Sequence, residues 1–184
     1  MANTPSNMIP LGSRATDFKL FDTVSGEDLS LNNLRGKRGT VIFFICNHCP
    51  FVIHVNHELT NIANDFLKLG ISFIAISSND IVKYPQDGPD LMKENARKNN
   101  YPFPYLFDAN QEVARAYDAA CTPDTYLFDE DMKLVYRGQI DDSRPGNGKP
   151  VNGKDLRNAI DFLLNSKGVV ASQKPSMGCG IKWK

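Results

Sequence analysis

The sequence predicts an α/β domain with a mixed central sheet flanked by helices, and three observations support this fold class. Residues 41–45 are consecutive apolar residues rich in β-branched and aromatic types, which is typical of a strand buried on both faces. An apolar stripe with helical spacing follows at 52–69, and a second apolar run at 71–77 completes a right-handed parallel crossover. Two later strand segments, 125–128 and 133–137, predict an antiparallel hairpin.

The chain before the central strand predicts a small N-terminal extension. Residues 1–12 are expected to form a loose leader. Residues 17–22 alternate in period two, and residues 29–31 resume the pattern after a turn, which predicts a β-hairpin. Residues 35–37 then form a turn into the central strand.

The segment after the central strand predicts the longest helix. Pro50 suits a first helical turn, where its missing N–H has no partner to lose. Apolar positions that step by three and four place one stripe of the helix against the core. These positions are Val52, Val55, Leu59, Ile62, Phe66 and Leu69. Gly70 suits the C-cap that ends the helix.

Short helices and extended segments alternate in the second half of the chain. A helix at 90–99, capped by Asp90, is expected to bury Leu91, Met92 and Ala96. The remaining predicted elements are an extended segment at 101–107, a short helix at 111–117, the hairpin, a loop at 142–153 and a helix at 154–166.

Length and composition bound the organisation and the class of protein. A chain of 184 residues suits one domain, which we expect over residues 13–166, with a C-terminal tail at 167–184 that contains Cys179. The 21 basic and 21 acidic residues cancel, so bulk charge indicates neither a nucleic acid nor an acidic membrane as partner. No window approaches the length of a membrane span, and the N-terminus lacks the pattern of a signal peptide, so we expect a cytoplasmic protein.

The candidate reactive residues lie where the central strand passes into the long helix. Cys46 and Cys49 form a Cys-x-x-Cys pair there, and a helix N-terminus stabilises an anion. Such a position can lower a cysteine pKa from about 8.5 to roughly 3.5–7.5, which yields the nucleophilic thiolate. We expect Cys46 to be the exposed attacking sulfur and Cys49 to resolve the mixed disulfide. His48, when protonated, would favour the Cys46 thiolate further, which makes it a pKa-tuning residue.

A zinc site is the alternative interpretation of the same residues, because a Cys-x-x-Cys can be half of a metal site. His54 and His57 lie just downstream. The cysteine and histidine pairs of structural zinc sites are usually separated by a dozen or more residues, whereas only four residues separate Cys49 from His54. We therefore expect redox chemistry with no metal and no cofactor.

The order of these elements resembles a thioredoxin fold, and Thr122-Pro123 matches the loop whose proline is cis in that family. The hairpin extension and the segments 101–108 and 125–129 resemble the peroxiredoxin branch, which includes alkyl hydroperoxide reductases and thiol-specific antioxidants. As a whole, the chain is similar over residues 11–184 to peroxiredoxin-like proteins that carry a thioredoxin-type Cys-x-x-Cys.

The resemblance implies a thioredoxin-like fold in which the loop of Thr122 and Pro123 faces the cysteine pair and binds substrate through its backbone. It also leaves two activities open. The first is a thiol–disulfide oxidoreductase, and the alternative is a thiol peroxidase that reduces hydrogen peroxide or alkyl hydroperoxides. Peroxiredoxins use a Pro-x-x-x-Thr/Ser-x-x-Cys loop, but counting back from Cys46 gives Phe43 and Gly39 at those places. The first activity is therefore favoured.

Two further cysteines have two interpretations each. Cys121 adjoins the loop of Pro123 and is either a third redox thiol or a small buried hydrophobe. Cys179 lies between glycines and is either a resolving thiol on a flexible tail or an unreactive tail cysteine. Polar residues after predicted strand ends are weaker candidates, namely Asn79, Asp80, Asp141, Asp142 and Arg144.

The sequence therefore predicts a redox enzyme whose partners are protein or small-molecule disulfides, or else peroxides, together with an unidentified thiol reductant. Neither nucleic acid nor membrane is expected as a partner.

Overall fold

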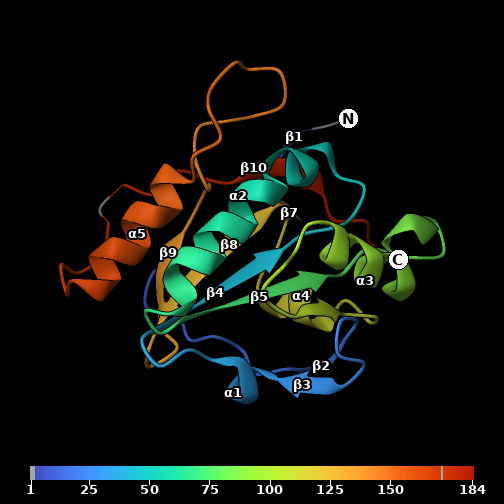
Figure 1. Ribbon diagram of the computed structural model, residues 1–184, viewed down its shortest axis with the longest axis horizontal. Coiled ribbons are helices and arrows are strands. Elements are labelled where there is room, and N and C mark those ends of the chain that lie inside the picture. The colour runs from blue at the N-terminus through green and yellow to red at the C-terminus, as the bar shows by residue number, and fades with distance from the viewer. Residues whose placement is uncertain (1–2, 171) are drawn as a thin grey trace.

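The computed structural model describes residues 3–170 and 172–184 and has the expected α/β architecture (Figure 1). The helices are α1 (Leu31–Leu34), α2 (Pro50–Leu67), α3 (Pro89–Lys98), α4 (Glu112–Ala116) and α5 (Lys154–Leu164), with a 3-10 turn η1 at Pro85–Asp87. The strands are β1 (Asn3–Pro5), β2 (Lys19–Asp22), β3 (Asp28–Ser30), β4 (Gly39–Phe44), β5 (Ile71–Ser77), β6 (Tyr105–Phe107), β7 (Cys121–Thr122), β8 (Asp124–Asp129), β9 (Leu134–Arg137) and β10 (Met177–Gly180).

Seven strands form the central sheet in the order β3-β2-β6-β5-β4-β8-β9. The strands β4, β5 and β6 are parallel, and the outer pairs are antiparallel, so the sheet is mixed as predicted. Strand β4 lies next to β5 and β8, and every residue of it is buried, as its unbroken apolar run indicates. The predicted N-terminal hairpin is confirmed as β2 paired with β3.

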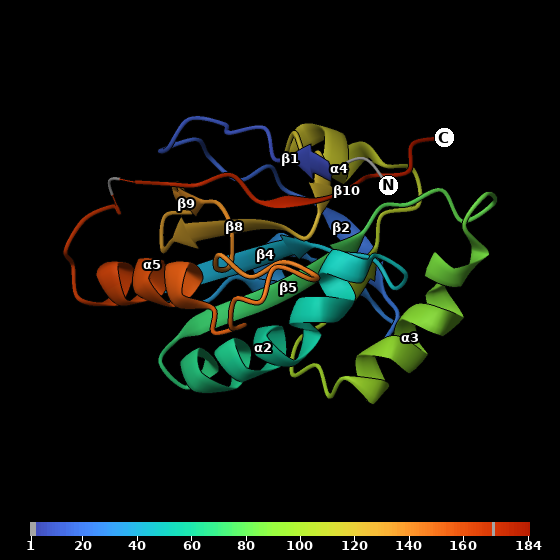
Figure 2. The same ribbon diagram turned by 90° about the horizontal axis from the view of Figure 1, so that it is seen from above.

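Helices cover both faces of the sheet (Figure 2). Alternate residues of β4 point to opposite faces, so Val41 and Phe43 join the cluster under α2, α3 and α5, whereas Ile42 and Phe44 join the cluster under α1 and α4. The strand thereby ends between two packed layers, which fixes the position of the residue that follows it.

Helix α2 begins and ends close to the positions that the sequence predicts. Pro50 is its first residue, Cys49 is its N-cap, and Gly70 adopts φ +91° just after it ends. Leu69 lies beyond the last helical turn and is 45% exposed, so its place in the apolar stripe was wrong. Leu91 is likewise 43% exposed, although Met92 and Ala96 of the same helix are buried as expected.

The expected loose leader and flexible tail were both wrong. Strand β10 lies between β1 and β7 in a second, three-stranded sheet, where Asn3 pairs with Cys179 and Cys179 pairs with Thr122. The end of the tail is fixed as well, because Lys182 donates its backbone N–H to Asn79 at 2.8 Å. These short strands lack a local apolar pattern, and only pairing over a long sequence distance orders them.

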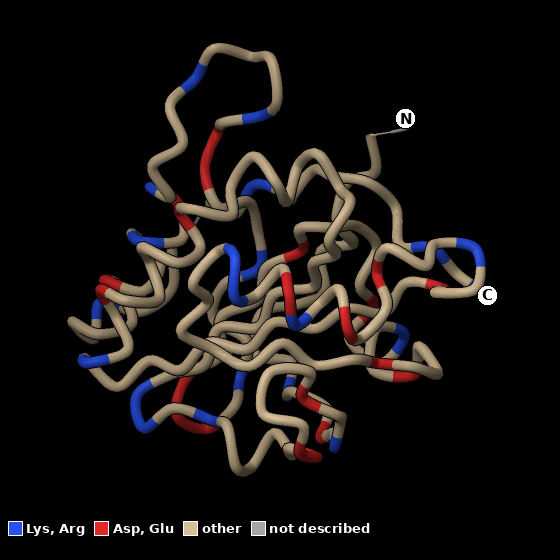
Figure 3. Tube along the Cα trace, turned by 45° about the vertical axis from the view of Figure 1, so that its right-hand side comes forward, with Lys and Arg blue, Asp and Glu red and all other residues tan. Residues whose placement is uncertain are grey.

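Charges of both signs are interspersed along the outer loops and helices (Figure 3), and among the described residues no helix is long and apolar enough to cross a membrane. One ion pair is nevertheless fully buried. The Arg137 guanidinium donates to Asp124 Oδ2 at 3.2 Å and to the backbone oxygen of Asp118 at 2.8 Å, and it stacks 4.4 Å from the ring centre of Tyr126. Asp124 Oδ2 also accepts the backbone N–H of Ala120 at 3.2 Å, so this pair closes the loop that carries Pro123.

We expect Arg137→Leu to lower the free energy of unfolding by roughly 3–5 kcal/mol at pH 8, because it leaves a buried carboxylate without its partner. Burial raises the pKa of Asp124 to about 6 even with Arg137 present. A carboxyl whose folded pKa is raised contributes stability at low pH and loses it as the pH rises through the folded value. The variant should therefore recover part of its stability below pH 6.

Urea unfolding at pH 5 and pH 8 would measure both effects. Arg97→Leu is the matched control, because Arg97 is exposed on α3 and such surface changes usually stay within about 0.5 kcal/mol. Equal losses in the two variants would contradict the structural role of Arg137.

Candidate active site

The two cysteines of the motif lie at the junction of β4 and α2, as the sequence predicts. Cys46 follows the end of β4, and Cys49 caps the N-terminus of α2. The relative exposures of Cys46 and Cys49 are 1% and 0%, so the expectation of an exposed Cys46 was wrong. The reason is that β7 and the turn η1, both distant in sequence, close over the sulfurs.

The loop of Thr122 and Pro123 faces the cysteine pair. The peptide bond between these two residues is cis, as the resemblance implies. Thr122 contacts both sulfurs, because its Oγ1 lies 3.5 Å from Cys46 Sγ and its backbone oxygen lies 3.1 Å from Cys49 Sγ. One residue of β7 therefore positions both members of the pair.

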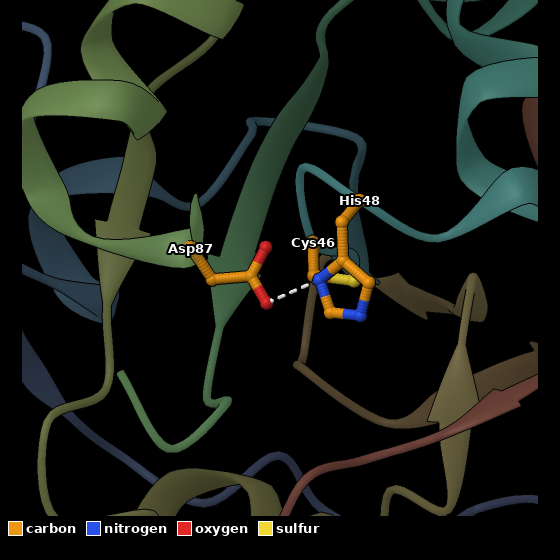
Figure 4. Close-up of side chains that lie close together, drawn as sticks. All are labelled: Cys46, His48 and Asp87. Atoms are coloured by element: carbon orange, nitrogen blue, oxygen red, sulfur yellow. Dashed lines mark hydrogen bonds and ion pairs between the residues drawn. The ribbon is translucent and has the colours of Figure 1, made fainter. Parts of the chain in front are cut away.

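A histidine–carboxylate pair lies beside Cys46 (Figure 4). His48 Nδ1 is 2.7 Å from Asp87 Oδ2, and the ring of Tyr84 stacks on the imidazole with 5.4 Å between ring centres. The Asp87 carboxylate is buried and accepts two more hydrogen bonds, from the Asn47 backbone N–H at 2.9 Å and from Asn79 Nδ2 at 2.8 Å. These bonds fix the two residues between the cysteines relative to η1.

Asp87 was missed in the sequence, where it lies in a polar loop between two prolines. Its only signal is its place after β5, whose end lies beside that of β4. Asn79, one of the weaker candidates, is now explained as a support of Asp87 and of the C-terminal tail. The other weak candidates, Asp80, Asp141, Asp142 and Arg144, bond within their own loops or to segments packed against them. Asp141 and Arg144 also line a pocket that Pro123 borders.

The surroundings of the two sulfurs shift their pKa values in opposite directions, and they favour the negative charge on Cys49. The hydrogen bond that Cys46 donates to Cys49, followed by burial and the nearby Asp87 carboxylate, raises the pKa of Cys46 well above its ordinary value. The same hydrogen bond, followed by those from Thr122 and Cys179 and by the Val52 amide, lowers the pKa of Cys49 to about 4 against the cost of burial. These contacts favour the thiolate on Cys49, whereas the sequence predicts it on Cys46.

Cys179 lies beside Cys49, and Cys121 does not take part in this contact. Cys179 and Cys49 are hydrogen-bond partners, so Cys49 is the middle sulfur of three. The Cys121 sulfur faces the backbone oxygen of Pro123 at 3.6 Å, and burial raises its pKa. Cys121 therefore fits the interpretation as a small buried hydrophobe.

The described residues contain a group that could hold a metal ion, but it is not the one weighed from the sequence. One ligand atom each from Cys46, His48 and Asp87 lie within 4.8 Å of one another. His54 and His57 lie elsewhere on α2 and bond to Ser143 and Asn61.

Comparison with known proteins identifies the family. The model of the AhpC/TSA family matches residues 11–137, more than half of the chain. The chain belongs to the AhpC/TSA family. It is 28% identical to the thiol-disulfide oxidoreductase ResA of Geobacillus kaustophilus (strain HTA426) over 142 residues, which are 74% of this chain and 75% of that protein.

Two solved structures place the fold of this AhpC/TSA protein. An uncharacterized conserved protein from Geobacillus kaustophilus is 56% identical, with a TM-score of 0.98 over 100% of this chain and 97% of that one. The peroxidoxin BcpB from Mycobacterium tuberculosis has a TM-score of 0.64 over 86% of this chain and 98% of that one, and at 19% identity it supports the thioredoxin-like fold alone. The chain is thus a member of a family of thiol-based redox enzymes.

The lowered pKa of Cys49 predicts that the thiolate absorbance of this AhpC/TSA protein depends on pH in an unusual way. In the reduced protein, thiolate absorbance near 240 nm should persist as the pH falls and disappear with a midpoint near 4, the pKa of Cys49. Cys46→Ala should move that midpoint upward, because it removes the hydrogen bond that contributes most to the low pKa. Cys121→Ala is the control and should leave the midpoint in place. A wild-type midpoint between 8 and 9, the range of a free cysteine, would contradict the arrangement.

A lowered pKa also has a consequence for stability. A group whose folded pKa is depressed contributes stability above its unfolded pKa and loses it as the pH falls through the folded value. For Cys49 that window runs from pH 9.0 down to about 4, so the stability advantage of the reduced protein over Cys49→Ala should shrink steadily across it. Urea unfolding of both proteins under a reductant would measure the difference in their free energies of unfolding. A difference that stays constant over this pH range would contradict the presence of a thiolate on Cys49.

Proposed function

We propose that this protein is a thiol–disulfide oxidoreductase that cycles between a Cys46/Cys49 dithiol and a Cys46–Cys49 disulfide. The single observation that supports this most is the placement of both sulfurs against one residue, with Cys46 at the hydroxyl and Cys49 at the backbone oxygen of Thr122. Thiol–disulfide exchange needs one thiolate, a second thiol in reach of it and a surface that positions both.

The first step is attack by Cys46 on the substrate disulfide. As Cys46 attacks, its proton passes to Cys49, which already accepts its hydrogen bond. A bond forms between Cys46 Sγ and one substrate sulfur, the substrate S–S bond breaks, and the leaving thiolate takes the proton from Cys49.

The second step resolves the mixed disulfide. The Cys49 thiolate attacks Cys46 Sγ, the Cys46–Cys49 bond forms, and the second substrate thiolate leaves and takes a proton from water. The substrate has then gained two electrons, which the protein has lost. A thiol reductant restores the dithiol by the reverse sequence.

His48 and Asp87 position Cys46 and set the charge around it. The buried Asp87 carboxylate disfavours a thiolate on Cys46, and this carboxylate is held by the ring of His48 through the 2.7 Å contact between Nδ1 and Oδ2. His48 and Asp87 are therefore positioning residues, and the charge stays on Cys49 until Cys46 attacks.

The proposed substrates are protein or small-molecule disulfides, and the proposed compartment is the cytoplasm, where cysteines are more often catalytic than structural. Neither sulfur is exposed, so access of a protein substrate requires movement of β7 or η1, which lie against the pair. The similarity to a thiol-disulfide oxidoreductase supports this substrate class.

The decisive experiment is trapping of the mixed disulfide. Cys49→Ser should accumulate Cys46 joined to a disulfide substrate, because the resolving thiol is missing, whereas Cys46→Ser should neither trap substrate nor reduce insulin. Mass spectrometry after incubation with oxidised glutathione would detect the adduct, and Cys121→Ala is the control that should reduce insulin like the wild type. A glutathione adduct on Cys49 in Cys46→Ser, with none in Cys49→Ser, would reverse the two roles and refute this order of attack.

A thiol peroxidase is the competing activity within the AhpC/TSA family. In that reaction one cysteine becomes a sulfenic acid and a neighbouring thiol condenses with it. Phe43 and Gly39 occupy the places of the hydroxyl residue and proline that hold peroxide in peroxiredoxins, and both lie in the buried strand β4. We expect hydrogen peroxide consumption at a rate no greater than that of free cysteine, measured by loss of peroxide under excess reductant. A rate a hundredfold higher would favour the peroxidase.

A further inference from the structure

The C-terminal strand lies on the same platform that positions the cysteine pair. Strand β10 runs antiparallel to β7, with Cys179 opposite Thr122. Residues paired in this way lie about 4.5–5.5 Å apart at Cα. Cys49 Sγ lies 3.1 Å from the backbone oxygen of the same Thr122. Thr122 is therefore a shared neighbour of Cys49 and Cys179.

The surroundings of Cys179 are those of the cysteine pair. Cys179 belongs to the apolar cluster that contains Cys46 and Cys49, and it is buried there although it lies in the last ten residues of the chain. Cys49 contacts Cys46 on one side and Cys179 on the other, so the three sulfurs form a chain with Cys49 in the middle.

Resting on the proposed function, we propose that Cys179 is a third redox thiol, which attacks Cys49 of the Cys46–Cys49 disulfide to give a Cys49–Cys179 disulfide and a free Cys46 thiol. In this step the Cys49–Cys179 bond forms and the Cys46–Cys49 bond breaks. Cys179 is oxidised, Cys46 is reduced, and the proton that Cys179 loses ends on Cys46. No external oxidant is needed, because the disulfide only moves within the chain.

Gly178 is the residue that allows this approach. A Cβ at position 178 would lie 2.0 Å from the backbone oxygen of Thr122 and 2.6 Å from its carbonyl carbon, both of them rigid backbone atoms. At Gly180, two residues along the same strand, the nearest atom to such a Cβ is the Thr4 side-chain oxygen at 3.2 Å. Alanine at 178 must therefore push β10 off β7, whereas alanine at 180 needs only a small adjustment of a side chain.

The exchange has a consequence for both ends of the site. The Cys49–Cys179 bond ties the N-cap of α2 to β10 and so closes the strand over Thr122. At the same time it returns Cys46 to the thiol state beside His48 and Asp87. The oxidised protein thus holds its disulfide away from the attacking cysteine.

Disulfide mapping tests the proposal. The full chain is treated with one equivalent of oxidised glutathione, quenched with acid, alkylated and digested with trypsin, which leaves Cys46 and Cys49 in one peptide and Cys179 in another. We expect the cross-linked peptide pair in the wild type and none in Cys46→Ser, because the relay starts from the Cys46–Cys49 disulfide. We expect none in Cys49→Ser, because Cys46 is not the neighbour of Cys179.

The glycine variants control for accidental oxidation. The cross-linked fraction should fall at least tenfold in Gly178→Ala and should stay within twofold of the wild type in Gly180→Ala. Cross-linking of Cys46 to Cys179 in Cys49→Ser, or equal cross-linking in the two glycine variants, would overturn the proposal, since either result indicates a mobile tail that reacts unselectively.

The test separates this proposal from the proposed function. If the wild type reduces insulin and forms only the Cys46–Cys49 bond, with Cys179 left as a free thiol, the relay is refuted and the oxidoreductase stands. If the wild type neither reduces insulin nor forms any bond at Cys46 or Cys49, the proposed function itself has failed.

Discussion

The site depends on the conformation of the loop at residues 120–124, which is fixed on two sides. On one side, the buried Arg137–Asp124 pair and the hydrogen bond from Ala120 to Asp124 hold the start and end of the loop together. On the other side, β10 pairs with β7 and presses its glycine backbone against Thr122. Thr122 then presents its hydroxyl to Cys46 and its carbonyl oxygen to Cys49. A shift of this loop would change the environment of both sulfurs at once.

Burial shapes the chemistry of the pair as strongly as the helix N-terminus does. Taking a thiolate out of water raises the pKa of a cysteine, and burial acts in this direction on both Cys46 and Cys49. Two features offset this cost of burying a thiolate. The pair carries one negative charge rather than two, and hydrogen-bond donors lie around that charge. Cys49 has more of these donors, whereas Cys46 lies nearer to the Asp87 carboxylate. The distribution of the charge therefore follows from neighbours that come from η1, β7 and β10.

The sequence predicts those parts of the fold that have a local periodicity. The buried run of β4, the apolar stripe of α2 and the position of Cys49 at its N-cap all follow from residue patterns within a few turns of chain. The exceptions arise where a pattern continues past the element that carries it. Leu69 has the spacing of the α2 stripe but lies after the final turn, so its side chain is exposed.

Contacts between distant segments could not be predicted in this way. Cys179 lies between two glycines, which indicates flexibility when the segment is considered alone, yet these glycines permit the close packing of β10 on β7. Asp87 is one polar residue among several in its loop, and only the fold brings it to His48. The pKa order of the two cysteines depends on both of these contacts, so local patterns locate the reactive pair but do not determine which sulfur carries the charge.

The second sheet explains why the C-terminal strand and the active site belong together. A two-residue strand such as β7 leaves backbone N–H and C=O groups open at its edge, and an open edge is a template for another extended chain. In this structure β10 occupies that edge and places a cysteine against Cys49, which is the arrangement that a bound peptide with a cysteine would need. Any extended substrate that pairs with Thr122 must therefore compete with β10. Displacement of this strand would therefore open the edge of β7 and would separate Cys179 from Cys49.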